Sequence, residues 1–259
     1  GSVMHTQKTD LLLRSMIDYV EKLDQKRNSV ELAYLCGFLT HYYLDRECHP
    51  YVYWRTNYLN RKKDYLEKHY QYENDMDVAL LRTMRNATPY EFLKVSQIKI
   101  DGQDRERVCN MLYYAIHNTY TDSRITLRGI RLAIISIQKE QRFFKMCSNG
   151  IKTAVETVEE YFIGQAYLAL LIPGVDKEIS EDPLNLRHDM WRNPWKPEKC
   201  SDASVPEMME KAGAQFLVAT HLLEDYLYEF KGDETAYHML LGRIGRASYH
   251  SGLSCDIPS

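Results

Sequence analysis

The stretch Ala33-Tyr-Leu-Cys-Gly-Phe-Leu-Thr-His41-Tyr-Tyr-Leu-Asp45-Arg-Glu-Cys-His49-Pro50 decides the fold, because it sets three metal-competent side chains four residues apart on one expected helix. Successive side chains at this spacing are offset by about 40° around a helix and about 6 Å along it, so His41, Asp45 and His49 share one stripe. The two histidines are about 12 Å apart along the axis, too far for one zinc ion about 2 Å from each nitrogen. We therefore expect His41 and Asp45 to bind one metal, and His49, at a helix end set by Pro50, to bind a second.

A second stretch, Lys63-Asp-Tyr-Leu-Glu-Lys-His69-Tyr-Gln-Tyr-Glu73-Asn-Asp-Met-Asp77, repeats this spacing. His69 and Glu73 are one helical turn apart, and Asp77 is one turn further on. A short connection over residues 51–62 would let this second helix pack antiparallel beside the first, with its stripe facing back. The two stretches thus predict a metal centre between two helices.

The predicted centre has the composition of a catalytic zinc site. His49, His69 and Glu73 make a set of two histidines and one carboxylate with an open coordination position, which is typical of catalytic rather than structural zinc. Asp77 continues the stripe, and we expect it to orient a histidine ligand from behind.

A histidine on an apolar helix is more often a hydrogen-bonded core residue than a ligand, and a single pair of this kind is a weak signal. Two such pairs on neighbouring helices are much harder to attribute to chance. An Asp45 without a metal would also be a carboxylate buried at substantial cost, which ligation removes. The residues that would bury it are apolar or aromatic: Leu35, Phe38, Leu39, Tyr42 and Tyr43.

Composition excludes some function classes and leaves others open. The chain has 259 residues, of which 44% are hydrophobic, and these values suit one domain over residues 1–259 with a sizeable core. A net charge of −3 gives no basic field for nucleic acid or an anionic membrane, and this counts against a nuclease. No apolar run approaches a membrane span and no signal peptide is visible. Gly1-Ser2 is compatible with a cloning remnant, in which case the natural amino-terminal segment is missing.

The six cysteines are scattered without a Cys-x-x-Cys pair or the density of a disulfide scaffold. We expect free thiols and a cytoplasmic protein, or a secreted one if an amino-terminal signal has been removed. Cys48 points about 100° away from the histidine stripe, so packing is favoured over ligation for it.

Most of the remaining chain is predicted to be helical. Ser29 is the expected N-cap of the first metal helix, and His5 precedes a helical pattern that starts near Leu11. Residues 95–102 alternate like a strand or an extended loop. Further helices are expected over residues 105–120, 123–146, 151–171 and 205–230.

Two later segments are predicted to lack regular structure. Residues 173–206 hold three interleaved prolines and two tryptophans, and we expect an ordered irregular segment lying across the bundle. After residue 230 we expect a glycine-rich tail that contains Gly242, Gly245 and Gly252.

The two histidine stretches together resemble the zinc-dependent phospholipase C family of bacterial enzymes. The residues that carry the resemblance are Gly37 to Asp45, His49-Pro50, and His69-x3-Glu73-x3-Asp77. Met4-His5 looks like the early metal histidine of that family, and residues 182–204 are similar to a loop of its intracellular branch. The resemblance implies an all-α fold, a multi-helix bundle with a metal cluster between helices, shared with single-strand nucleases of the P1 type.

The resemblance also implies a ligand set. It places His5, His41 and Asp45 on one zinc and His49, His69 and Glu73 on another, so two zinc ions are expected, or three if Asp45 bridges to a further ion. Secreted members complete their third site with the amino-terminal residue and an early histidine, and use an Asp before the early metal histidine as a ligand or general base. Only Gly1-Ser-Val-Met precedes His5 here. Either an amino-terminal segment is missing or the third site is incomplete.

The expected activity is hydrolysis of a phospholipid or another small phosphate ester, with zinc-activated water and with Asp45 and Glu73 in the catalytic centre. Tyrosines near the site could line a pocket for a choline-like cation, although such residues are more often core. A single-strand nuclease of the same fold and a non-catalytic, zinc-stabilised binding module are the two alternatives.

Overall fold

The computed structural model describes residues 2–89, 91–92, 98–146, 149–163 and 179–256, and most of these residues are helical. The prediction of an all-α fold is confirmed. The chain separates into two compact units, residues 1–50, 100–133 and 206–259 in the first and residues 51–99 and 134–205 in the second. Two helices, α3 (Val30–Arg55) and α7 (Leu127–Met146), continue from one unit into the other. The prediction of a single domain stays a prediction.

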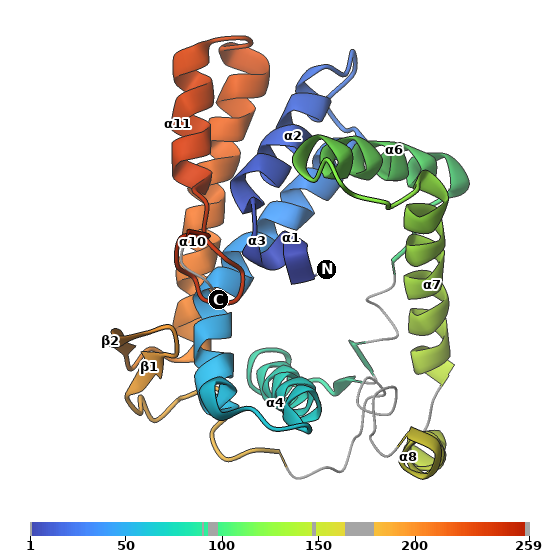
Figure 1. The fold of residues 1–259 in the computed structure, drawn as a ribbon, viewed down its shortest axis with the longest axis vertical. Coiled ribbons are helices and arrows are strands. Elements are labelled where there is room, and N and C mark those ends of the chain that lie inside the picture. Colours follow the sequence, from blue (N-terminus) through green and yellow to red (C-terminus); the bar gives the residue numbers. More distant parts are fainter. Residues whose placement is uncertain (1, 90, 93–97, 147–148, 164–178, 257–259) are drawn as a thin grey trace. The chain divides into compact units, whose positions relative to one another are not determined.

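The first unit is built on a pair of helices, α2 (Thr9–Glu21) and α6 (Gly102–Thr119), which lie side by side (Figure 1). A short helix α1 (Ser2–Thr6) precedes them. Apolar residues recur on α2 every three or four positions, so that one face is buried. The fully buried side chains on this face are Leu12, Leu13, Met16, Ile17 and Val20.

Helix α3 begins as the sequence predicts but ends later. The Ser29 hydroxyl accepts a hydrogen bond from the Leu32 backbone N–H at 3.1 Å, which confirms Ser29 as the cap. The prediction that Pro50 ends the helix is wrong, because α3 continues through Pro50 to Arg55. Proline removes only one backbone donor, the one that would serve the Arg46 carbonyl, and tertiary packing outweighs that loss.

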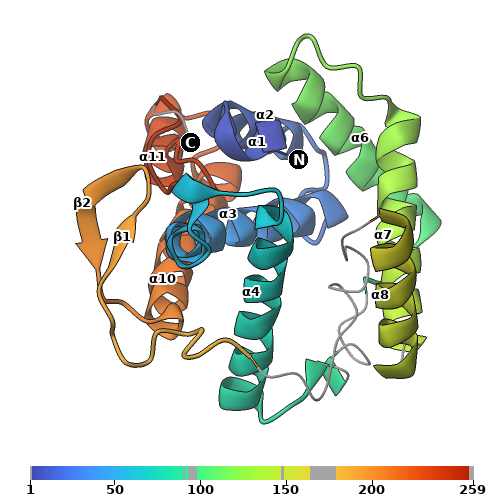
Figure 2. The ribbon, with the colours of Figure 1, turned by 60° about the horizontal axis from the view of Figure 1, so that its bottom comes forward.

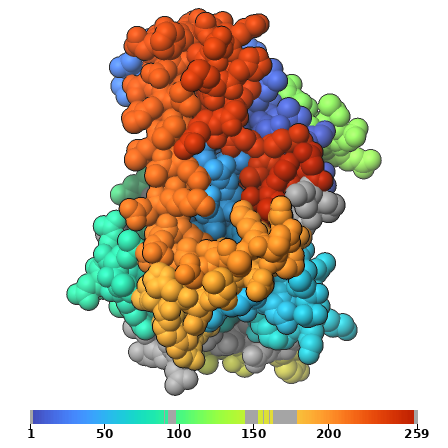
Figure 3. All heavy atoms as spheres, turned by 90° about the vertical axis from the view of Figure 1, so that its left-hand side faces the viewer, coloured from blue at the N-terminus to red at the C-terminus, as the bar shows by residue number. Residues whose placement is uncertain are grey.

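The C-terminal segment packs against α3 at this same carbonyl. Gly252 has a φ of +62°, and a Cβ atom built on it would lie 2.3 Å from the Arg46 oxygen. Only glycine allows this approach. Figure 3 shows part of α3 between α10 and the C-terminal residues.

The C-terminal part of the first unit contains three helical elements. These are α10 (Val205–Glu224), the π-helix η3 (Asp225–Glu229) and α11 (Glu234–Ile244). A glycine-rich tail was expected after residue 230. The prediction of an irregular tail is therefore wrong for residues 234–244. Asp233 caps α11 by accepting from the Ala236 N–H at 2.8 Å, and Gly242 is tolerated inside the helix because it faces open space.

The second unit contains η1 (Tyr58–Asn60), α4 (Tyr65–Leu80), the π-helix η2 (Leu81–Arg85) and α8 (Asn149–Ile163). The second histidine stretch is thus helical, as expected. Helix α8 covers the described part of the predicted helix 151–171, whose later residues lie outside the described ones. Of the predicted strand or loop 95–102, residues 95–97 also lie outside them.

Part of the stretch predicted to be irregular, residues 173–206, forms a hairpin, and residues 173–178 lie outside the described ones. Strands β1 (Trp191–Asn193) and β2 (Lys196–Ser201) pair antiparallel, as Figure 2 shows. The tyrosine hydroxyls of Tyr51 and Tyr72 donate to the Pro183 carbonyl at 3.3 and 3.1 Å, which ties the loop before β1 to α4. The tryptophans do order this segment, as predicted, but a short sheet replaces irregular chain.

Candidate metal centre

The first group of metal-competent side chains lies on α3 in the first unit. His41 Nε2 is 3.3 Å from Asp45 Oδ2, and His49 Nδ1 is 3.5 Å from the same oxygen. The Asp45 side chain is only 13% exposed. Two donor atoms held by one tetrahedral zinc at about 2.0–2.1 Å lie about 3.3 Å apart, so the spacing of His41 and Asp45 fits the ion.

His5 joins this group from α1. Its ring centroid is 5.6 Å from that of His41, and it stacks on Tyr249 at 4.7 Å. Burial, and then repulsion from His41, His250 and His49, lowers the pKa of His5 to about 4. His5 is therefore neutral at neutral pH, the form that binds a metal.

The ring orientation of His49 is fixed by the C-terminal segment. Its Nδ1 is 2.9 Å from the Tyr249 carbonyl oxygen. A carbonyl can only accept, so Nδ1 carries the proton and Nε2 keeps its lone pair. A backbone carbonyl on one ring nitrogen is a common support for a metal-binding histidine.

The second group lies on α4 in the second unit. His69 Nε2 is 3.1 Å from Glu73 Oε1, and His69 is buried while Glu73 is about one third exposed. The Tyr65 hydroxyl lies 3.1 Å from His69 Nδ1, and the Tyr53 ring packs on the His69 ring with centroids 4.8 Å apart. This pair too has the donor types and the spacing that zinc accepts.

Asp77 shares the helix with these two residues, and part of its side chain is exposed while the carboxyl group lies against the surrounding chain. Desolvation by the surrounding chain, followed by repulsion from Glu73, raises its pKa to about 6. Tyr65, rather than Asp77, contacts the Nδ1 atom of His69. A role for Asp77 in orienting a ligand stays a prediction.

Three contributors were missed at the level of sequence. Tyr65 lies four residues before His69 on the same helix, a spacing that could have revealed it. Tyr249 lies 200 residues after His49, and no periodicity marks it or His250. Cys48 is buried, and burial raises the pKa of its thiol to about 12, in keeping with the predicted packing role.

These groups stand in the part of the chain that a comparison with known families recognises. Residues 1–124 match the zinc-dependent phospholipase C family. The match confirms the resemblance drawn from the two histidine stretches, and it covers every residue predicted to bind zinc. The zinc-dependent phospholipase C family supports zinc as the cofactor and a phospholipase C-like function. No curated protein and no solved structure matches the chain.

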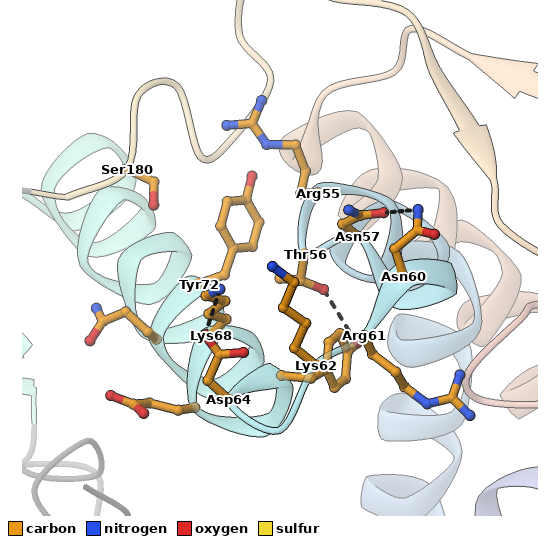
Figure 4. A pocket seen from close by; sticks show the side chains of 13 residues that line it. Arg55, Thr56, Asn57, Asn60, Arg61, Lys62, Asp64, Lys68, Tyr72 and Ser180 are labelled. Atoms are coloured by element: carbon orange, nitrogen blue, oxygen red, sulfur yellow. Dashed lines mark hydrogen bonds and ion pairs between the residues drawn. The ribbon is translucent and has the colours of Figure 1, made fainter. Parts of the chain in front are cut away.

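A pocket of about 600 Å³ opens in the second unit, at the amino-terminal end of α4 (Figure 4). Four of its thirteen lining residues are basic and two are acidic, with Lys62 reaching across its middle and Lys68 paired with Asp64. Neither His69 nor Glu73 is among its lining residues. The pocket is therefore distinct from the histidine and carboxylate pair on α4.

No helix among the described residues is long and apolar enough to cross a membrane.

Proposed function

We propose that this protein is a zinc-dependent hydrolase of phosphate esters, acting on a phospholipid or a related phosphodiester. The observation that carries the proposal is the pair of histidine and carboxylate groups on α3 and α4, inside the part of the chain that matches the zinc-dependent phospholipase C family. The donors are imidazole nitrogens and carboxylate oxygens, which zinc prefers in hydrolases.

One ion is assigned to His49, His69 and Glu73, each of which offers one ligand atom. The support comes from α3, which is a single helix on both sides of Pro50. His49 precedes Tyr53 by four residues, or about 6 Å along the helix, and the Tyr53 ring packs on His69. The nitrogen of His49 that keeps its lone pair is Nε2, since the Tyr249 carbonyl occupies Nδ1.

A second ion is assigned to His5, His41 and Asp45. The Oδ2 atom of Asp45 lies 3.3 Å from His41 Nε2, a spacing that suits two donors on one ion. Its 3.5 Å contact with His49 is to Nδ1, the nitrogen that carries the proton, so the bridge from Asp45 to a third ion is proposed on the family resemblance alone.

The zinc ligands and the residues around them have different proposed roles in the reaction. Zinc held by such ligands would lower the pKa of a bound water molecule toward 7 and would offset negative charge on a phosphoryl group. Glu73 and Asp45 hold negative charge beside the reacting atoms, and Tyr65 fixes the orientation of the His69 ring. Partial burial of both carboxylates keeps bulk water from screening them.

The test combines metal analysis with turnover. We expect the purified protein to hold two zinc ions and to hydrolyse a chromogenic phosphodiester, with activity lost on chelation and restored by zinc. His49→Ala and Glu73→Ala should each release about one zinc and lower turnover by more than about 100-fold, because a ligand matters at least as much as the groups that support it.

Glu67→Ala is the matched control, because Glu67 lies on α4 two residues before His69 and outside both ligand sets. It should keep zinc and turnover. Full zinc content and full activity in both ligand variants would refute the assignment. Preferential cleavage of single-stranded nucleic acid would favour the nuclease, and two bound zinc ions without turnover would favour a binding module.

A further inference from the structure

A third histidine lies beside the group formed by His5, His41 and Asp45. The ring of His250, from the C-terminal segment, is 5.8 Å from the ring of His5 and 6.2 Å from that of His49, measured between centroids. His250 lies far outside residues 1–124, the part that matches the zinc-dependent phospholipase C family.

The segment that carries His250 is attached to both sides of the group. The Tyr249 N–H donates to the His5 carbonyl at 2.9 Å, and the Tyr249 carbonyl bonds to His49 Nδ1 at 2.9 Å. The Ser248 hydroxyl donates to the His5 carbonyl at 3.3 Å and accepts from the His250 N–H at 3.1 Å. These bonds fix the backbone on each side of His250 against α1 and α3.

Packing reinforces this attachment. Ser248 and Ser251 are fully buried, and Gly252 sits directly on the Arg46 carbonyl of α3. A tail that merely covered the protein surface would not need buried polar residues and a glycine with a positive φ. The segment thus has the rigidity that a ligand-bearing loop requires.

The ring spacing fits a shared metal ion. Two imidazoles on one tetrahedral zinc, each with a Zn–N distance of about 2.0–2.1 Å, have centroids roughly 5 Å apart. The observed separations from His5, 5.6 Å to His41 and 5.8 Å to His250, are each within about 1 Å of that value. Among the described residues, only His49, His69 and Glu73 already hold three such ligand atoms within 4.8 Å of one another, so the nitrogens of His5, His41 and His250 would have to approach through rotation of their side chains.

We propose that His250 is the fourth protein ligand of the zinc ion assigned to His5, His41 and Asp45. This inference rests on the proposed function, since it adds a ligand to an ion already assigned there. Three imidazoles and one carboxylate would close a tetrahedral sphere, and the absence of an open position is the mark of a structural rather than a catalytic site. The ion at His49, His69 and Glu73 then has the open position, and the two ions have different tasks.

Zinc affinity tests the proposal without reference to turnover. Apo protein would be titrated with zinc against a competing chelator, with the fold checked by circular dichroism. In His250→Ala we expect one of the two zinc affinities to fall more than tenfold while the other is unchanged. His250→Cys should restore the affinity, because a thiolate also binds zinc, and His250→Gln, similar in size, should not.

His221→Ala is the control, because His221 is exposed at the end of α10, and it should bind zinc as the wild type does. Two unchanged affinities in His250→Ala or in His250→Gln would overturn the role of His250. If His250→Ala fails to fold, the cysteine and glutamine variants decide. Loss of one zinc in His49→Ala together with no loss in the His250 variants would refute this inference alone, whereas a wild-type protein without zinc would refute the proposed function as well.

Discussion

At the scale of single residues, the arrangement around His69 separates binding from positioning. Its Nε2 atom lies 3.1 Å from Glu73, and its Nδ1 atom lies 3.1 Å from the Tyr65 hydroxyl, which is also 3.3 Å from the Thr56 hydroxyl. A hydroxyl held in this way can accept the Nδ1 proton and leave Nε2 for a metal. Tyr65 is therefore a positioning residue, and removing its oxygen should weaken metal binding without removing a ligand.

Tyr65→Phe should lower the affinity of one zinc site by about 10- to 100-fold, as is usual when the partner of a metal-bound histidine is lost. The ring and its packing remain, so the far-UV circular dichroism spectrum should not change. Tyr58→Phe is the matched control, since Tyr58 packs against Tyr65 with ring centroids 5.5 Å apart. An unaltered zinc titration in Tyr65→Phe would show that the hydroxyl does not orient His69.

At the scale of elements, short-range sequence patterns predicted where α3 begins and which residues of α3 and α4 share a helix face. They failed where contacts between residues far apart in the chain determine the structure. The cap at Ser29 and the four-residue spacing around His69 act within one or two turns, so sequence alone reveals them. The passage of α3 through Pro50 depends on packing along both of its parts. The position of His250 depends on backbone bonds to His5, a residue more than 240 positions away.

Helix α11 shows how glycines can mislead. Three glycines suggested an irregular tail, but Gly242 lies inside the helix with open space around it, Gly245 follows its end with a φ of +72°, and Gly252 lies in the C-terminal segment. Only backbone conformation and surroundings distinguish a glycine that is required from one that is tolerated. Neither can be read from composition.

Two glycine-to-alanine substitutions should therefore change the free energy of unfolding in opposite directions. Gly252→Ala places a methyl group on the Arg46 carbonyl at a positive φ and should cost about 1–3 kcal/mol of unfolding free energy. Gly242→Ala, in the helix and facing open space, should add about 0.5–1 kcal/mol. Urea denaturation of both variants measures the difference, and a neutral Gly252→Ala would show that the C-terminal segment is not held against α3.

At the scale of the whole molecule, the proposed metal sites draw on residues that are far apart in the chain. His5, His41 and Asp45 come from α1 and α3, His69 and Glu73 from α4, and no disulfide is formed among the cysteines of the described residues. A ligand that binds the folded chain and not the unfolded chain stabilises it by mass action. Zinc should therefore contribute to the stability of this protein as well as to its chemistry.

Zinc at a free concentration of about 100 times the dissociation constant should add about 2.7 kcal/mol for each site, and chelation should lower the melting temperature accordingly. Thermal denaturation of apo and zinc-loaded protein measures this effect. Magnesium at the same concentration should not reproduce it, because magnesium prefers an octahedron of oxygen ligands over imidazole nitrogens. If His250 closes the site at His5, His41 and Asp45, His250→Ala should lose from about a quarter of the zinc-dependent stabilisation, for a tenfold loss of one affinity, to about a half, for loss of that site, and Glu67→Ala should lose none. Equal melting temperatures for apo and zinc-loaded wild type would mean that these side chains do not bind zinc in the folded chain.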